Sequence, residues 1–341
     1  MLTVKFVART AANQDPALWR ALLPGGALDA FGVRYTFDPD ARDYDYLVVY
    51  EDLPYPPDTT RSTRREPLAC APANTLFVTT EPTSIKVYGR HYLRQFGHVL
   101  SRQPADVIDH PGHIQRTPPL RWYYGRPFGE GRYTTVDELA AHDPAKSKPL
   151  STVCSAKRMA ETLHAQRYDF TFGLKDRMPD MLDMFGRGVR PIADKAEAMD
   201  AYRTHIAIEN HISPGHWTEK ISDCFLAGCL PFYYGPPDIA DTFPAEAVIP
   251  IDIFGLDGAE DTIRRAIADD AYTSALPALR EAKRITLEDQ NLLKVCADIA
   301  RDTHVSGKPS SDILGRHAFR AAHPMLAARD ALQQRRIKGH W

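Results

Sequence analysis

The sequence has little cysteine, no excess of either charge and no long apolar run. It holds five cysteines without C-x-x-C spacing, which we expect to be reduced thiols in a cytoplasm. Its 42 basic and 44 acidic residues nearly balance, which argues against a strongly charged partner such as nucleic acid. No run reaches the roughly 18 apolar residues that span a membrane. The first residues, MLTVKFVART, look like a strand and not a signal peptide. We therefore expect a cytoplasmic protein.

Several common site motifs are also missing. There is no P-loop, no G-x-S-x-G and no complete G-x-G-x-x-G, and the missing glycine fingerprint disfavours a nicotinamide-dependent oxidoreductase. His205, His211 and His216 have no ligand partners at the spacing of a metal site. We therefore expect a protein that needs neither a metal nor a cofactor.

The length of 341 residues favours two domains, each large enough to bury its own core. Apolar runs flanked by turn residues predict strands in the first half, at Leu2–Ala8, Val33–Phe37, Tyr46–Tyr50 and Leu76–Thr80. The stretch His142–Pro149 is polar and holds two prolines, as a linker does. After it the pattern restarts, with a strand at Leu150–Cys154 and a helix from about Lys157 to Arg167. We predict an α/β fold with an N-terminal domain over 1–145, a C-terminal domain over 150–305 and a helical tail over 306–341.

Polar residues gather where strands and helices change over between Tyr202 and Asp252. A short apolar run, THIAIEN, ends in Glu209 and Asn210, and a helical pattern begins near Thr218 with Glu219 and Lys220. In open α/β sheets, ligands bind beyond the carboxyl ends of the strands. The start of a helix favours phosphate, and Lys220 adds a full positive charge there. These residues predict a nucleotide-diphosphate site with polar groups left over for a sugar.

The same segment resembles the donor-binding signature of the α-1,3-fucosyltransferase family, glycosyltransferase family ten. The resemblance lies in Tyr-Arg, then Glu-Asn, then Thr-Glu-Lys with Glu219 nine residues after Asn210, then Gly-x-Pro. It implies two Rossmann-like domains that face a cleft, the GT-B type. It also implies transfer of a sugar from a nucleotide donor with inversion, with Glu209, Asn210, Glu219 and Lys220 at the donor. Read without the resemblance, Glu209 and Lys220 are ordinary solvated charges at the ends of elements.

A second segment, Ser155 to Arg167, resembles the family's Ser-x-Lys…His-x-x-Arg. By that resemblance Arg167 contacts the donor pyrophosphate, a role that suits the planar and permanently charged guanidinium. The alternative is that Arg167 is a cation near a helix C-terminus, where it complements the helix dipole. Lys157 and Arg158 are weaker candidates of the same segment.

Inverting transfer needs a carboxylate that takes the proton of the acceptor hydroxyl. Glu81 ends a buried apolar run just before Pro82, and it matches the position of the family's proposed catalytic glutamate. It could instead cap the helix that follows. Glu51 and Asp52, after another predicted strand, are the runner-up carboxylates.

One position departs from the family pattern. Six residues after Asn210 the family usually has tyrosine, whereas this chain has His216 followed by Trp217, either of which could stack on the donor. The resemblance is good from about Leu150 to Ile253 and weak before Leu76. The donor is therefore better supported than the acceptor.

The carboxyl end is basic, with Arg335, Arg336 and Lys338 near Trp341. This pattern fits peripheral contact with the inner face of an anionic plasma membrane, and it equally fits a solvated helix. Together these features predict a cytoplasmic bacterial transferase that moves L-fucose from GDP-L-fucose to a surface glycan of the lipopolysaccharide or O-antigen type. The alternatives are a related transferase that uses another nucleotide sugar, and a catalytically silent protein that binds nucleotide sugars or glycans.

Overall fold

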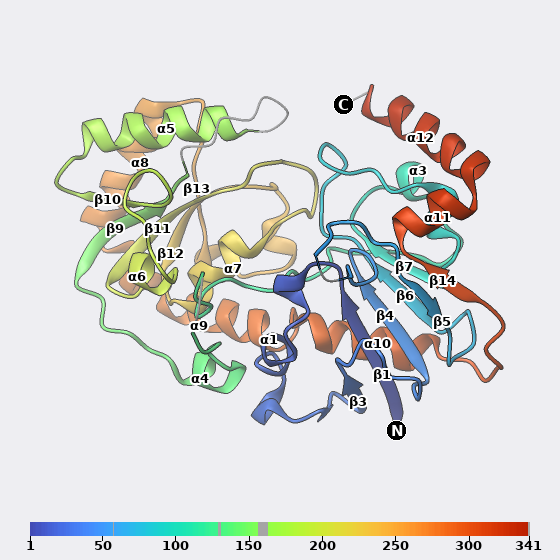
Figure 1. Ribbon diagram of the computed structural model, residues 1–341. Helices are drawn as coiled ribbons and strands as arrows, with labels where there is room; N and C mark the ends of the chain where they lie inside the picture. The colour runs from blue at the N-terminus through green and yellow to red at the C-terminus, as the bar shows by residue number, and fades with distance from the viewer. Residues whose placement is uncertain (57, 129–130, 156–162, 340–341) are drawn as a thin grey trace. The chain divides into compact units, whose positions relative to one another are not determined.

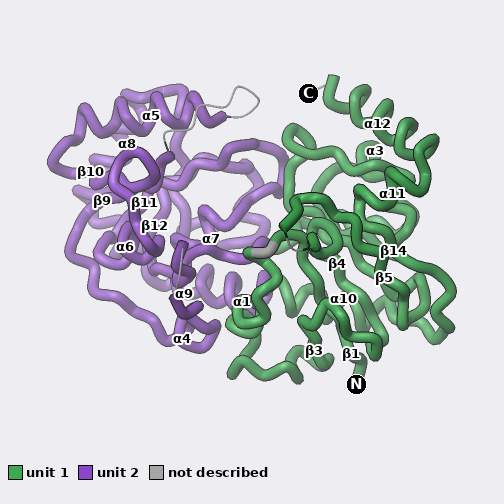
Figure 2. The backbone as a smooth tube through the Cα atoms, in the orientation of Figure 1, with its two compact units in different colours: residues 1–119, 292–341 green, residues 120–291 purple. Residues whose placement is uncertain are grey.

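The computed structural model describes residues 1–56, 58–128, 131–155 and 163–339. The chain forms two compact units, one of residues 1–119 and 292–341 and one of residues 120–291 (Figure 2). Each unit holds a largely parallel sheet with helices packed around it, so the predicted α/β class with two Rossmann-like domains is confirmed (Figure 1). The cleft between the domains that the GT-B type also implies stays a prediction.

The sheet of the first unit has the strand order β2-β3-β1-β4-β6-β7-β8, parallel except for the β2–β3 pair. Its strands are β1 (Leu2–Ala8), β2 (Asp29–Ala30), β3 (Val33–Thr36), β4 (Tyr46–Tyr50), β6 (Thr75–Val78), β7 (His98–Ser101) and β8 (His113–Gln115). The central strands β4 and β6 are buried along their whole length, as their continuous apolar sequences predict.

A second, smaller ladder in this unit pairs β5 (Arg65–Pro67) antiparallel with β14 (Asp312–Leu314). Glu66 of β5 is buried, and its Oε1 accepts a hydrogen bond of 2.7 Å from Nζ of the fully buried Lys5. A buried carboxylate and ammonium tolerate each other only when they pair in this way. Glu66 therefore neutralises Lys5 in the middle of β1.

The helices of the first unit come from both ends of the chain. They are α1 (Pro16–Arg20), α2 (Arg90–Leu93), α3 (Ala105–Ile108), α10 (Leu292–Thr303), α11 (Arg316–Ala322) and α12 (Pro324–Lys338). Helix α10 packs against β1, and the hydroxyl of Tyr35 on β3 donates to the carbonyl of Leu293. The amide of Val305 donates to Oδ1 of Asn74. Residues 292–341 are thus built into the first unit.

The sheet of the second unit is parallel throughout, in the order β10-β9-β11-β12-β13. Its strands are β9 (Lys148–Val153), β10 (Leu182–Phe185), β11 (Tyr202–Ile208), β12 (Leu230–Tyr234) and β13 (Ile249–Pro250). Its helices are α4 (Val136–Ala141), α5 (His164–Arg177), α6 (Ala196–Met199), α7 (Glu219–Leu226), α8 (Leu256–Ala268) and α9 (Ala271–Leu287).

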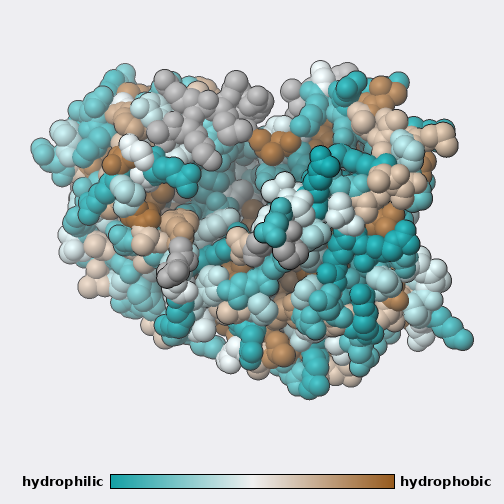
Figure 3. Space-filling view, viewed as in Figure 1, coloured by the Kyte–Doolittle hydropathy of each residue, from teal (hydrophilic) through white to brown (hydrophobic). Residues whose placement is uncertain are grey.

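Large apolar side chains gather inside each unit rather than on its surface. In the second unit, Phe170 and Leu174 of α5 pack with Ile206 of β11 and Phe232 of β12 in one buried cluster. On the face drawn in Figure 3, hydrophilic residues predominate and hydrophobic ones occur between them in small groups. The sheet and its helices therefore bury most of their apolar area, which is the main favourable term in folding.

The observed units correct the predicted domain boundaries of 1–145, 150–305 and 306–341. Residues 120–145 belong to the second unit, where the amides of Tyr123 and Tyr124 donate to Oδ1 of Asp223. Residues 292–305 belong to the first unit, as does the tail. The expected linker 142–149 consequently lies inside the second unit, and its last residues begin β9. Polar and proline-rich composition marked a surface loop, not a boundary.

The predicted helix from Lys157 to Arg167 falls partly outside the described residues, because 156–162 are not among them. The described helix α5 runs from His164 to Arg177 and so begins later and extends further than expected. Arg167 lies in its first turn and not at its C-terminus. The helix-dipole explanation for Arg167 is therefore wrong.

Candidate functional site

The carboxyl edge of the second sheet carries most of the predicted donor residues. Glu209 and Asn210 directly follow β11, and Ser155 follows the neighbouring strand β9. Helix α7 begins at Glu219, after Thr218 caps it by accepting a hydrogen bond from the amide of Lys220. Because β9 and β11 are parallel neighbours, their ends meet at one edge of the sheet.

Glu209 holds the start of α7 in place. Its carboxylate is buried and accepts hydrogen bonds from the Thr218 amide at 2.9 Å and from the Tyr233 hydroxyl at 3.1 Å. The Thr218 hydroxyl and Nζ of Lys220, at 3.0 Å, also donate to it. These bonds use the carboxylate within the protein. The solvated-charge alternative for Glu209 is therefore wrong, and its contacts indicate that it positions Thr218 and Lys220.

Lys220 is a largely buried cation. Its Nζ lies 3.0 Å from the Glu209 carboxylate and 3.7 Å from that of Glu219, and about a fifth of the side chain, 20%, is exposed. Burial alone would lower the pKa of Lys220, but the carboxylates of Glu209 and Glu219 together raise it well above its ordinary value. Lys220 thus stays charged at neutral pH.

Arg167 joins the ends of two strands. Its Nη1 donates to Oδ1 of Asn210 at 2.8 Å, and its Nη2 donates to the Ser155 hydroxyl at 3.4 Å. Nε of Arg167 is buried and has no hydrogen-bond partner among the described residues. The guanidinium acts on Lys220 electrostatically and counters the rise in the pKa of that lysine. The structure therefore brings Arg167, Asn210, Glu209, Glu219 and Lys220 together, as the sequence predicted.

His216 lies in the loop between β11 and α7 and is mostly buried. Its ring meets that of His211 edge to face, with centroids 5.8 Å apart, and burial lowers the pKa of His211. Trp217 is buried against Phe243, with ring centroids 5.2 Å apart. Trp217 therefore belongs to the core, so its proposed stacking on the donor is unsupported and His216 remains the candidate.

The sequence did not indicate a second group of charged and aromatic residues in this unit. Nζ of Lys195 lies 5.5 Å from the ring centroid of Tyr123 and forms an ion pair with the buried Asp223. The guanidinium of Arg121 lies 4.8 Å from the same ring. Glu219 acts on both Lys195 and Tyr123 electrostatically, which places this group beside the start of α7.

No local signal could have identified these residues. Arg121 and Tyr123 lie about a hundred residues from Asp223 in the chain, and the contact through the Asp223 carboxylate brings them to α7. The Lys195–Asp223 pair likewise joins a loop to a helix. Only the pairing of distant segments shows that they are neighbours.

In the first unit, Glu81 follows β6, whose last residue is Val78. The backbone around it is fixed by Gln103, whose Nε2 donates to the carbonyls of Glu81 and Lys86, both at 2.8 Å. Pro82 and the residues after it form turns, and the next described helix is α2 from Arg90. The alternative that Glu81 caps a following helix is thus not supported.

The two runner-up carboxylates are held inside the first unit. Asp52 is buried and accepts hydrogen bonds from the Ser62 hydroxyl at 2.6 Å and the Tyr92 hydroxyl at 2.9 Å. Glu51 pairs with Arg9 at 3.1 Å and accepts from the Thr80 hydroxyl at 2.6 Å. These contacts indicate that Asp52 is structural, because a base needs an oxygen that can reach its substrate.

Within the described residues, no three His, Cys, Asp or Glu side chains gather as a metal site. None of the described helices is long and apolar enough to cross a membrane.

No protein-family model matches the chain. Among solved structures, an α1,3-fucosyltransferase with GDP-fucose is similar over 85% of this chain and 90% of its own, at 14% identity and a TM-score of 0.47. A DNA-modifying β-glucosyltransferase is similar over 88% of this chain and 100% of its own, at 10% identity and a TM-score of 0.47. A glycosyltransferase from Rickettsia africae is similar over 90% and 99%, at 9% identity and a TM-score of 0.46. Likenesses at this level do not establish a family.

Proposed function

We propose that the protein is an inverting, metal-independent glycosyltransferase that moves L-fucose from GDP-L-fucose to a hydroxyl of a bacterial surface glycan. The observation that carries the proposal is the joining of Arg167, Asn210 and Ser155 at the carboxyl edge of the second sheet. This edge also holds Lys220 at the start of α7. The motif resemblance assigns the donor to these same positions.

On the donor side, the reaction requires mainly that the leaving diphosphate be stabilised. As the sugar leaves, negative charge develops on the nucleoside diphosphate, and fixed cations in a site from which water is largely excluded stabilise it. Arg167 would supply a planar fork for phosphate oxygens and Lys220 a point charge. Glu209 would keep Lys220 oriented, and Glu219 with His216 would contact the sugar or the base. Lys195 and Arg121 would extend the positive potential toward the diphosphate.

Glu81 is the proposed base. It would accept the proton of the acceptor hydroxyl as that oxygen attacks the sugar. Two observations support this role. Glu81 follows β6 at the carboxyl edge of the first sheet, and the alternative carboxylate, Asp52, already accepts hydrogen bonds from Ser62 and Tyr92. Replacing Glu81 by glutamine should abolish turnover and leave GDP binding unchanged.

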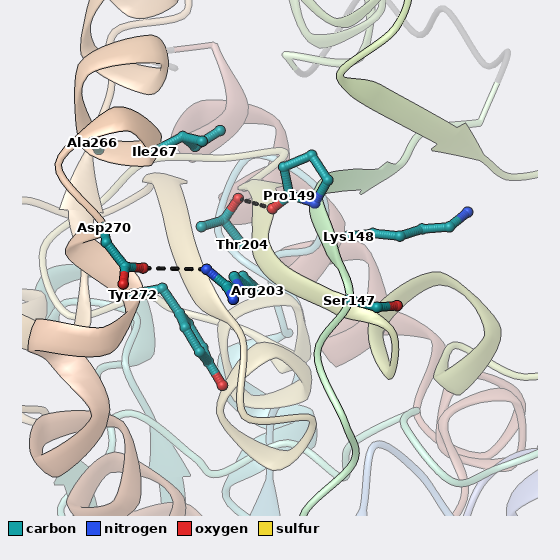
Figure 4. Close-up of a pocket in the computed structure, with 9 residues that line it drawn as sticks. All are labelled: Ser147, Lys148, Pro149, Arg203, Thr204, Ala266, Ile267, Asp270 and Tyr272. Carbon is teal, nitrogen blue, oxygen red and sulfur yellow. Dashed lines mark hydrogen bonds and ion pairs between the residues drawn. The ribbon is translucent and has the colours of Figure 1, made fainter.

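Titration calorimetry with GDP, UDP, CMP and ADP tests the donor site. We expect selective binding of GDP that weakens at least about tenfold in Arg167→Ala, the loss of one charge-assisted contact. The matched control is Arg203→Ala. Arg203 is the second residue of β11, at the opposite, amino edge of the same sheet. There it lines a pocket of about 200 Å³ and pairs with Asp270 at 3.4 Å (Figure 4). Loss of binding in Arg203→Ala instead would move the nucleotide to that edge and overturn the proposal.

A donor panel separates the related alternatives. A preference for UDP would support a transferase but exclude GDP-fucose as its donor. Binding of GDP-fucose without turnover on any glycan would favour a catalytically silent binding protein. We also propose a cytoplasmic location with peripheral contact of the carboxyl tail to the inner face of the plasma membrane. Helix α12 supports this contact, because Met325 and Leu332 are exposed on it beside arginines.

A further inference from the structure

A pocket of about 330 Å³ lies within the first unit between helices α11 and α12 and the segment that leads into α2. Figure 1 shows α11 and α12 as the last two helices of the chain. Most of its wall is apolar, and Phe319, Pro324, Ala327 and Ala331 line one side. Val87, Tyr88 and Tyr92 line the other. A small apolar or aromatic group would be well matched to these surfaces.

Two arginines also line this pocket. Arg316 and Arg320 are four residues apart on α11 and so share one face of the helix. Nε of Arg316 is buried without a hydrogen-bond partner, and its nearest acid, Oδ2 of Asp52, lies 3.9 Å away. Arg320 is exposed and has no ion pair with any described residue.

The acids near the pocket are already used by the protein. Asp330 lines it, but its carboxylate accepts hydrogen bonds from the amides of His91 and Tyr92 and lies 2.7 Å from Nδ1 of His91. The Asp52 carboxylate accepts from Ser62 and Tyr92. Asp52 faces Arg316 at 3.9 Å, and among the described residues neither Asp52 nor Asp330 forms an ion pair with Arg320.

A third cation, Lys86, contacts Tyr88, one of the residues that line the pocket. Nζ of Lys86 is buried, has no hydrogen-bond partner among the described residues and lies 4.4 Å from the ring centroid of Tyr88. Burial lowers the pKa of Lys86 to about 8, and the positive charge of Arg316 lowers it further than any other charged group does. Glu51 and Asp52 oppose this effect without reversing it. Arg316 and Lys86 are therefore close enough to act on each other electrostatically.

We propose that this pocket binds the phosphate end of an amphiphilic molecule. The two arginine forks match phosphate oxygens, and a dianionic phosphate balances their charge. The apolar wall takes the group attached to the phosphate. The inference depends on the pocket alone and is independent of the proposed donor site, which lies in the other unit.

Binding of octyl phosphate below its micelle-forming concentration tests the proposal, measured by calorimetry on the full chain. We expect saturable binding at one site, at least about tenfold tighter than for octanol or inorganic phosphate and at least about tenfold weaker in Arg320→Ala. Octanoate, which carries a carboxylate on a similar chain, distinguishes a phosphate from a general anion site. The matched control is Arg329→Ala, which removes an exposed arginine of α12 that does not line the pocket.

A second variant, Ala327→Phe, fills the pocket without changing its charge and should also weaken octyl phosphate. Equal affinity in wild type, Arg320→Ala and Ala327→Phe would overturn the proposal, as would equal binding of octanol. Tighter binding of octanoate would overturn the choice of phosphate. GDP titration of the same variants should match wild type, so that failure here and failure of the donor proposal are separate results.

Discussion

At the residue scale, Glu209 has a structural role within the motif that we propose binds the donor. Glu209 was predicted to contact the donor. Its carboxylate oxygens instead accept hydrogen bonds from Thr218, Lys220 and Tyr233 inside the protein. The motif residue therefore acts through its neighbours, since it fixes the start of α7 and orients Lys220.

Glu209→Gln should destabilise the protein by about 2–3 kcal/mol, because it leaves the ammonium of Lys220 largely buried without a full counter-charge. Urea unfolding followed by circular dichroism measures the change. The control is Glu288→Gln, which removes a carboxylate of an exposed pair with Arg284 and should change the free energy of unfolding by less than about 1 kcal/mol. Equal effects in the two variants would show that the Glu209 network is not a source of stability.

Lys86 should make stability depend on pH in the basic range. Its pKa is about 8 in the folded protein against a usual 10.5, chiefly because it is buried. Below pH 8 the folded protein must hold the buried charge, and between pH 8 and 10.5 the unfolded chain binds more protons, so stability rises with pH.

Lys86→Met should therefore raise the free energy of unfolding by about 1–3 kcal/mol at pH 7, and the gain should shrink as pH rises above 8. Urea unfolding at pH 7, 8, 9 and 10 gives the difference between the two proteins, in which the other titrating groups cancel. A gain that is constant with pH, or a loss of stability at pH 7, would contradict the depressed pKa.

The residues of the proposed donor site fall into two groups, according to whether their neighbours in space are also near in sequence. Glu209, Asn210, Glu219 and Lys220 could be placed together from the sequence because one strand, one loop and one helix join them. Asp223 and Lys195 could not, since a helix and a loop that are distant in sequence must first pack.

At the scale of elements, buried parallel strands were the easiest to predict. Strands β1 and β4 have the predicted bounds, because a charged residue, Arg9 or Glu51, directly follows each run and marks the end of the buried strand. The short strand β5 was not among the predicted strands. Its sequence, Arg65–Pro67, carries little β-propensity, and β14 from the far end of the chain holds it in place.

Helix α12 carries an exposed stripe that suits a membrane surface. Met325 and Leu332 are 80% and 52% exposed, and with Arg329 and Arg336 they repeat at spacings that place them on one face. Exposed apolar residues flanked by arginines are typical of a helix that lies on an anionic bilayer. Trp341, which the sequence suggested as an aromatic tip, lies outside the described residues.

The double variant Arg329→Glu, Arg336→Glu should bind anionic phosphatidylserine vesicles at least about tenfold more weakly than wild type, at about 1 kcal/mol for each basic residue near the surface. Cosedimentation with these vesicles and with neutral phosphatidylcholine vesicles measures it. The control, Arg265→Glu with Arg280→Glu, makes the same charge change on exposed positions of α8 and α9. If both double variants lose vesicle binding equally, the binding reflects the overall charge of the protein and not a contact made by α12.

At the scale of the whole molecule, the two units differ in how the chain builds them. The second is one continuous segment, 120–291, whereas the first combines 1–119 with 292–341. Helix α10 packs against β1 of the first unit, although the sequence had placed residues 292–305 in the C-terminal domain. The boundary at residue 120 could not be predicted, because it depends on the hydrogen bonds that the amides of Tyr123 and Tyr124 donate to the distant Asp223.

A fragment of residues 120–291 should therefore fold alone with a cooperative thermal transition, because its sheet and cluster of buried residues are complete. A fragment of residues 1–119 should not, since it lacks α10 against β1 and β14 beside β5. Adding a peptide of residues 292–341 should restore its transition. A stable fold of 1–119 without the peptide would show that the returning segment is only an addition to this unit.

The same return of the chain sets an order of events during synthesis. The ribosome delivers β1 to β8 first. The partners of Tyr35 and Asn74, the carbonyl of Leu293 and the backbone of Val305, emerge only after the whole second unit has been made. The second unit can complete its fold while the first unit still lacks α10, α11 and α12. For that interval the nascent chain exposes the flank of β1 that α10 later covers, so this surface is where a chaperone would have most to protect.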